Sequence, residues 1–61
     1  MKFILKASNK AFLEEFKEDK LIITSDPEKA KEFDRFGDAM AEAVEVNDVL
    51  DSSIFKVIPT C

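Results

Sequence analysis

Hydrophobic and polar residues alternate over the first seven positions of the chain. Phe3, Leu5 and Ala7 lie at a spacing of two, with Ile4 and lysines at the positions between them. This period is typical of a half-buried β-strand, so the pattern predicts a strand over residues 2–7. The polar residues 8–10 predict a turn. The segment 20–24 is rich in β-branched residues and predicts another strand.

Residues 11–16 fit two structures. Phe12, Leu13 and Phe16 match one turn of a helix, whereas Phe12, Glu14 and Phe16 match the alternation of a strand. A short turn after a first strand favours a hairpin, so we prefer the strand. In a strand, Phe12 and Phe16 would point the same way, and we expect both in the core.

The clearest helix start lies at residues 25–28. Asp26 can accept hydrogen bonds from the free amides of a first helical turn, and Pro27 suits the first helical position. A break is expected near Asp34, followed by a second helix from about residue 35 to residue 46 or slightly beyond. Its broad apolar side consists of Phe36, Ala39, Met40, Ala43, Val44, Val46 and Leu50.

A closing strand is predicted over residues 54–58, and we expect Pro59 to stop it. The elements together predict an α+β fold, roughly β-β-β-α-α-β, with one or two helices packed on one face of a small antiparallel sheet. A length of 61 residues fits one domain, 1–61. The predicted core is Phe3, Leu5, Ile22, Phe33, Phe36, Met40, Ala43, Val44, Leu50, Phe55 and Val57.

The residue types that the chain lacks limit the classes of function that we expect for it. The chain has no histidine and a single cysteine, Cys61, so it can form no internal disulfide and is not expected to bind zinc. It has no glycine-rich phosphate loop, and no base stands near its serines. A short chain also has little volume for a substrate pocket. We therefore expect no cofactor, no metal and no catalytic activity.

Small domains that lack a disulfide or a metal often gain stability by self-association, so we expect an equilibrium between monomer and homodimer. The longest apolar run is three residues, which predicts neither a membrane span nor the core of a secretion signal. Together with the lone thiol, this favours a cytoplasmic location.

Acidic residues dominate the middle of the chain. Residues 11–51 hold all thirteen acids against five bases, whereas the whole chain has a net charge of −4. Such a region disfavours direct binding to nucleic acid or to anionic lipid. Four carboxylates of the second helix share an arc of about 80° opposite its apolar side: Asp34, Asp38, Glu42 and Glu45. With Glu28 and Glu32 upstream, this row could imitate a phosphate backbone and occupy a basic groove of another protein. The alternative is an ordinary solvated helix face.

Several short segments carry a resemblance to a known group of proteins. They are Lys-Phe-Ile-Leu-Lys at 2–6, Leu-Ile-Ile-Thr-Ser-Asp running into Pro27, Ala30 with Phe33, and Phe-Lys-Val-Ile-Pro at 55–59. The pattern covers most of the chain and resembles short orphan proteins encoded by phages and prophages of low-GC Gram-positive bacteria. The resemblance implies an accessory gene of a mobile element, where small acidic proteins often inhibit host or defence machinery, and it implies no catalytic residues.

The expected function is therefore that of a binding protein. Its acidic helical face would block a basic groove on a host or defence protein in the host cytoplasm, with anti-CRISPR or similar anti-defence activity as the concrete form. The alternative is an accessory module that self-associates through a sheet edge or an apolar face. In that case the acids would serve only solubility.

Overall fold

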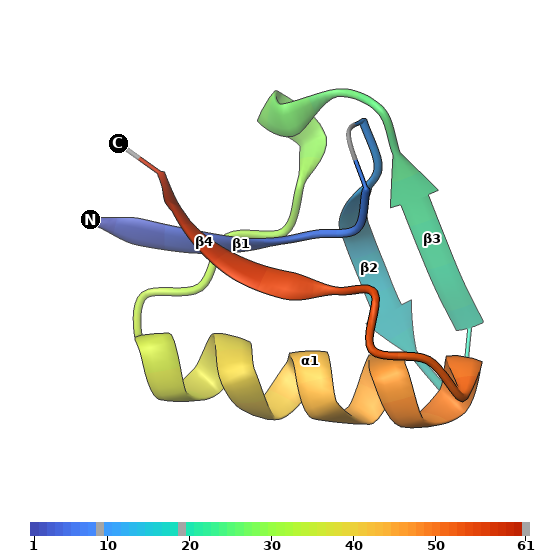
Figure 1. Cartoon of the computed structure of the whole chain (residues 1–61). Coiled ribbons are helices and arrows are strands. Elements are labelled where there is room, and N and C mark those ends of the chain that lie inside the picture. The colour runs from blue at the N-terminus through green and yellow to red at the C-terminus, as the bar shows by residue number, and fades with distance from the viewer. Residues whose placement is uncertain (9, 19, 61) are drawn as a thin grey trace.

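The structure is a computed structural model that describes residues 1–8, 10–18 and 20–60. It contains a four-stranded antiparallel sheet with strand order β3-β2-β1-β4 and one α-helix that lies along one side of it (Figure 1). The strands are β1 (Lys2–Lys6), β2 (Phe12–Lys17), β3 (Lys20–Thr24) and β4 (Lys56–Thr60), and the helix is α1 (Phe36–Leu50). The α+β class is confirmed, and residues 12–17 adopt the preferred strand.

The expected layout with two helices is not confirmed, because the first helix is a single 3-10 turn, Pro27–Lys29. Its start matches the prediction: Asp26 accepts a hydrogen bond from the Glu28 N–H at 2.9 Å, and Pro27 takes the first position. The turn ends at Ala30, where the backbone becomes extended. From there the Lys31 N–H donates to the Leu13 carbonyl oxygen at 2.9 Å, which draws the segment against β2.

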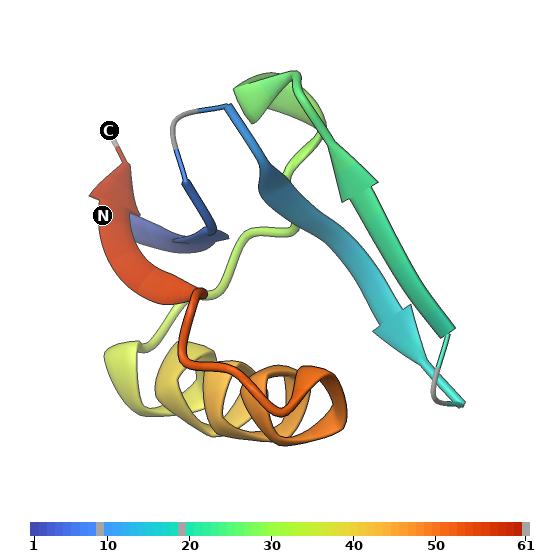
Figure 2. The ribbon, with the colours of Figure 1, turned by 45° about the vertical axis from the view of Figure 1, so that its right-hand side comes forward.

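The sheet bends sharply between its two halves. β1 pairs with β4 over five residues, but β1 and β2 share only the pair Lys6–Phe12. The β2–β3 ladder therefore turns steeply away from the β1–β4 ladder (Figure 2). The segment 30–33 enters the corner, where Phe33 and Phe3 exchange two backbone hydrogen bonds of 2.8 and 2.9 Å. These bonds replace the pairing that β2 does not provide.

Pro59 lies within β4 and does not end it as expected. Its partner in the register is Phe3, whose N–H and C=O both bond to Phe33 on the other side of β1. In an antiparallel ladder Pro59 therefore directs its backbone away from β1, towards the open edge of the sheet. A missing N–H costs no ladder bond there, which is why an edge strand tolerates proline.

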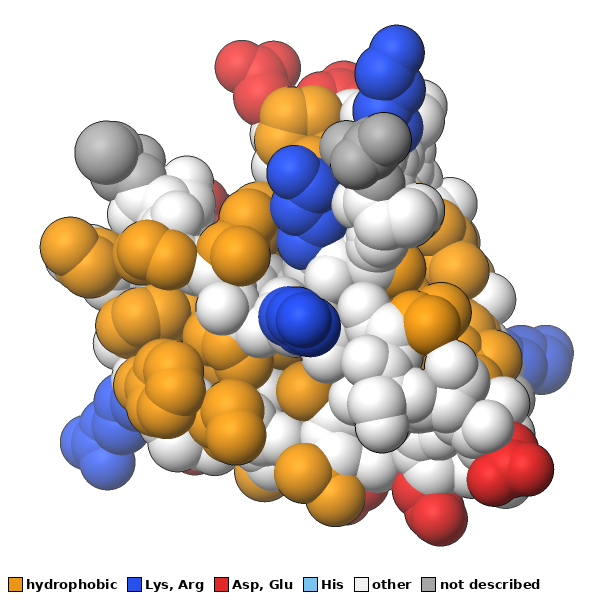
Figure 3. Space-filling model, viewed as in Figure 1, with side chains coloured by type: hydrophobic (Ala, Val, Ile, Leu, Met, Phe, Trp, Pro, Cys, Tyr) orange, Lys and Arg blue, Asp and Glu red, His pale blue; other side chains and the backbone are white. Residues whose placement is uncertain are grey.

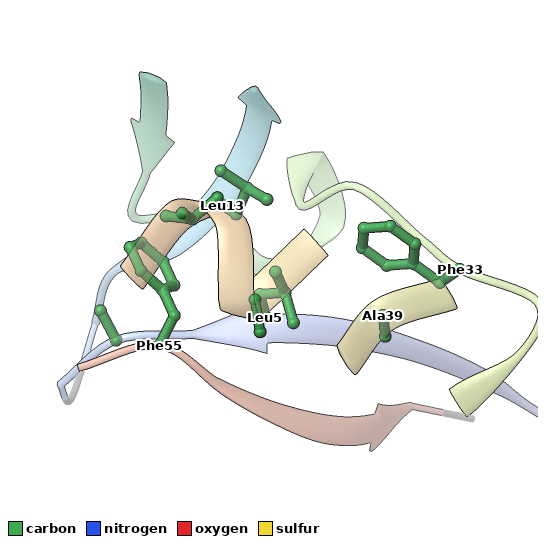
Figure 4. Packing of buried hydrophobic residues seen from close by; sticks show 8 residues of the cluster. Leu5, Leu13, Phe33, Ala39 and Phe55 are labelled. Atoms are coloured by element: carbon green, nitrogen blue, oxygen red, sulfur yellow. The ribbon is translucent and has the colours of Figure 1, made fainter. Parts of the chain in front are cut away.

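The main core lies between α1 and the sheet. In Figure 4, Leu5 of β1 lies among Leu13, Phe55, Phe33 and Ala39. Four members of the predicted core are buried, namely Leu5, Phe33, Ala43 and Phe55, while Phe3 and Val57 are partly buried. The prediction is wrong for five residues, which are exposed: Ile22, Phe36, Met40, Val44 and Leu50. α1 instead turns Ala39, Ala43 and Val46 towards the sheet.

A second, smaller cluster forms on the opposite face of β1. Ile4, which alternates with Leu5, packs there with Phe12 and Ala30. Phe16 packs instead against the cluster that faces α1. The expectation that both phenylalanines point the same way is wrong, because the register shifts between Leu13 and Glu15. A bulge of this kind adds one residue and reverses the alternation beyond it.

Candidate functional site

Three of the six candidate acids stand together on α1. Asp38, Glu42 and Glu45 lie within an arc of about 60° at the helical period, and we call these three residues the acidic face. Asp38 and Glu45 are exposed, and neither has a salt bridge within the part of the chain that the structure describes. Glu42 differs from both, since its side chain is only 17% exposed and its Oε2 lies 3.0 Å from Lys31 Nζ. Its charge is therefore partly balanced.

Asp34 does not belong to this row, because α1 begins two residues after it. Its carboxylate pairs with Lys2 of β1. The hydrogen bond from Lys2 holds the pKa of the Asp34 carboxyl below its usual value, and the same bond raises the pKa of the lysine. The negative charge of Glu32 adds to the rise in the pKa of Lys2. Asp34 and Glu32 thus act on a lysine of β1, whereas the sequence reasoning placed Asp34 in the helical row and Glu32 upstream of it.

Glu28 belongs to a third element, the 3-10 turn, where its side chain is exposed. The six carboxylates are therefore carried by a helix, an extended segment and a turn. Sequence reasoning missed Lys2 and Lys31 as balancing bases because they lie far along the chain from the acids they pair with.

A second surface was not anticipated. Phe36, Met40 and Val44 form a row along α1 with exposed fractions of 54%, 43% and 63%, and we call this row the apolar flank. The Phe36 ring meets Phe3 of β1 edge to face, with 5.6 Å between the ring centroids. Figure 3 shows hydrophobic side chains gathered over the beginning of α1 and the neighbouring ends of β1 and β4. By the helical period the apolar flank lies on roughly the opposite side of α1 from the acidic face.

The apolar flank was missed because sequence reasoning assigned the whole apolar side of the helix to the core. A helix that packs on a sheet buries one stripe, and here the stripe runs through Ala39, Ala43 and Val46. The signal that could have revealed the difference is residue size. The small side chains allow α1 to approach the sheet closely, which leaves the larger ones beside the contact.

The molecule also has two open hollows. One, of about 470 Å³, lies at the end of the β1–β4 ladder and is lined by Lys6, Lys56 and the Ser8 and Ser53 hydroxyls, with apolar Ala7, Ile54 and Ile58. Lys6 and Lys56 are direct cross-strand partners, and Lys6 Nζ also lies 5.8 Å from the centroid of the Phe12 ring. The other hollow, of about 540 Å³, lies at the C-terminal end of α1.

Across residues 1–8, 10–18 and 20–60, no three His, Cys, Asp or Glu side chains are grouped as metal ligands would be. No helix in the same ranges is both long enough and apolar enough to cross a membrane. Comparison with protein-family models, with curated proteins and with solved structures finds no significant match. The function is therefore argued from the surfaces of the molecule.

Proposed function

We propose that this chain is a small, non-enzymatic binding protein whose acidic face occupies a basic site on another protein. The observation that carries the proposal is the exposure of Asp38 and Glu45 on one side of α1, with no lysine or arginine pairing either of them among the described residues. In its concrete form the partner is a host or defence protein with a basic groove, and the chain is an inhibitor of that protein, encoded by a phage or another mobile element. The resemblance of its hydrophobic spacings to phage and prophage proteins supports that setting.

The acids of the acidic face differ in their effect on the helix, since Asp38 lies in the first turn of α1, where negative charge favours the helix dipole. Glu45 and Asp48 lie in the C-terminal half of α1, and its last turn has no basic residue. Negative charge at that end opposes the helix dipole, and like charges one turn apart repel each other. Glu45 therefore neither stabilises the helix nor enters the core, which supports a role in binding. Exposed charges of this kind steer a basic partner towards the surface and speed its association.

The test compares two double variants with the same change in net charge. Asp38→Asn/Glu45→Gln neutralises the acidic face, and Glu14→Gln/Glu15→Gln neutralises two exposed acids of β2 as the control. Each immobilised chain is used to capture proteins from host lysate at about 0.1 M and about 0.5 M salt. Circular dichroism establishes that both variants are folded.

We expect the acidic-face variant to lose the captured partner at both salt concentrations, while the control retains it at low salt. Capture by the parent should weaken at high salt, because screening reduces attraction between exposed charges. Equal capture by the two folded variants would refute a role for Asp38 and Glu45.

The apolar flank favours a second candidate function, that of a self-associating accessory module. In that case the acids would only keep the chain dissolved, and neutralising them would leave its interactions unchanged. Salt separates the two candidates, because association through apolar surface does not weaken as ionic strength rises.

A further inference from the structure

Small uncharged residues extend the apolar flank across the solvent side of α1. Gly37 and Ala41 lie beside the row of Phe36, Met40 and Val44 on the solvent side of the helix, and both are exposed. No atom outside the local backbone lies within 4 Å of the position that a Gly37 Cβ would take. The surface is therefore low beside the row of large side chains. A ridge beside a shallow strip matches the shape that a second helix needs for close packing.

The division of side chains between core and surface also indicates that the flank is covered. α1 contributes Ala39, Ala43 and Val46 to the core, of which only valine is large, while the bulkier side chains face outward. Monomeric proteins rarely leave a contiguous apolar patch of this kind uncovered. A chain of 61 residues has a small core to compensate for the exposure.

The charges at the two ends of α1 favour a second copy of this chain as the partner of the flank. Arg35 precedes α1 at one end, and Asp48 follows Val44 by one turn at the other. Figure 3 shows a basic side chain near the beginning of α1 and acidic side chains near its end. If two copies pack with their helices antiparallel, Arg35 of each lies near Asp48 of the other, and the two helix dipoles oppose. A parallel arrangement would bring like charges together.

The open edge of β4 offers a weaker route to self-association. Within Lys56–Thr60 the residues that direct their backbone outward are Val57 and Pro59, since their neighbours pair with β1. Pro59 has no N–H, so Val57 alone offers both a donor and an acceptor along this edge. Such an edge does not support an extended ladder with a second copy.

We propose that a second copy of this chain covers the apolar flank, related by a two-fold axis with the two α1 helices antiparallel. The acidic faces then point outward on both sides of the dimer, so the carboxylates of Asp38, Glu42 and Glu45 are kept away from the contact. A standard interface of about 800 Å² per copy would take roughly a fifth of the 4382 Å² surface of one chain. The flank has far fewer than the roughly 20–30 residues that each side of such an interface contributes, so we expect weak association with a dissociation constant on the order of 10 µM. The inference does not rest on the acidic face having a partner.

Sedimentation velocity from micromolar concentration to about 0.5 mM tests the proposal with a matched pair of variants. Val44→Glu places a carboxylate in the flank, whereas Val49→Glu changes another exposed valine, at 50% against 63% for Val44, near the acidic side of the same helix. The parent and Val49→Glu should form a species of twice the 6.9 kDa of one chain, and Val44→Glu should raise the dissociation constant by about tenfold or more. The parent dimer should persist at about 0.5 M salt.

The orientation has its own test. Arg35→Glu and Asp48→Arg should each weaken the dimer several-fold, because each places like charges opposite each other. The double variant should restore the dimer, because opposite charges then face each other again with their positions exchanged. A parent that stays at 6.9 kDa at about 0.5 mM would overturn the second copy as occupant and leave the flank to a different protein. Equal weakening by Val44→Glu and Val49→Glu would overturn the flank as the interface. A double variant as weak as the single ones would overturn the antiparallel arrangement.

Discussion

Asn47 links the end of α1 to the segment that leads into β4, so Asn47→Ala tests how the last strand is held in place. Its Nδ2 donates to the Phe55 carbonyl oxygen at 3.1 Å, and its Oδ1 accepts from the Phe55 N–H at 3.0 Å. The amide thus pairs with both backbone groups of Phe55, as a neighbouring strand would. Phe55 is 3% exposed and belongs to the main core, so this pairing positions a core residue.

The expected cost follows from the two hydrogen bonds. Each contributes about 1 kcal/mol net, so Asn47→Ala should lower the free energy of unfolding by about 2 kcal/mol. Desolvation of the Phe55 groups left without partners could raise the loss to about 3 kcal/mol. In a domain of this size, 2 kcal/mol corresponds to a fall in Tm of about 8–16 °C. That is a large part of the stability available to so small a core.

Urea unfolding followed by circular dichroism measures the effect, at a chain concentration that keeps the protein monomeric. The midpoint should fall while the slope stays unchanged, because the same surface is exposed on unfolding. Asp48→Ala is the control, since Asp48 is the exposed neighbour and its side chain makes no hydrogen bond within the described residues. Asn47→Asp should lose at least as much stability as Asn47→Ala, because a carboxylate oxygen would face the Phe55 carbonyl oxygen and its charge would oppose the helix dipole. A loss below about 0.5 kcal/mol for Asn47→Ala would refute the reasoning.

The remaining predictions concern other positions. Phe33→Ala should lower the free energy of unfolding by about 3–5 kcal/mol. Phe36→Ala should lower it by only about 1 kcal/mol in the monomer, because Phe36 is largely exposed and packs mainly on Phe3. Similar losses in urea unfolding would contradict the assignment of Phe33 to the core and Phe36 to the surface. Asp51→Gly should raise stability by about 0.5–1 kcal/mol, since Asp51 ends α1 with φ 52° and ψ 44°; a lower Tm would contradict this. The lowered pKa of Asp34 contributes stability above the usual carboxyl range that is lost as the pH falls through the folded value. As the pH is lowered, the melting temperature should therefore fall slightly less steeply for Asp34→Asn than for the parent. Parallel curves of melting temperature against pH would contradict a folded-state interaction.

Features that depend on a few neighbouring residues were predictable from the chain. The cap at Asp26 joins atoms two residues apart, and the strand at residues 20–24 follows from β-branched composition. α1 begins within one residue of the expected start, because the apolar period of 3.6 residues begins there. The three acids of the acidic face share one side of the helix for the same local reason.

The rotation of α1 on the sheet could not be predicted from its periodicity. The apolar side of the helix is wide enough to present either its small or its large residues to the core. The choice depends on the shape of the bent sheet, which arises from the bulge in β2 and the single pair that joins β1 to β2. Phe36, Met40 and Val44 are consequently exposed, although their sequence spacing is that of core residues.

Partners that are distant along the chain account for the rest. Residues 30–33 follow a good helix start, but backbone hydrogen bonds to Leu13 and Phe3 hold Lys31 and Phe33 in an extended segment. The charges of Glu42 and Asp34 are balanced by lysines 11 and 32 residues away. Local propensity is worth a few tenths of a kcal/mol per residue, so several hydrogen bonds and buried side chains from elsewhere in the fold outweigh it.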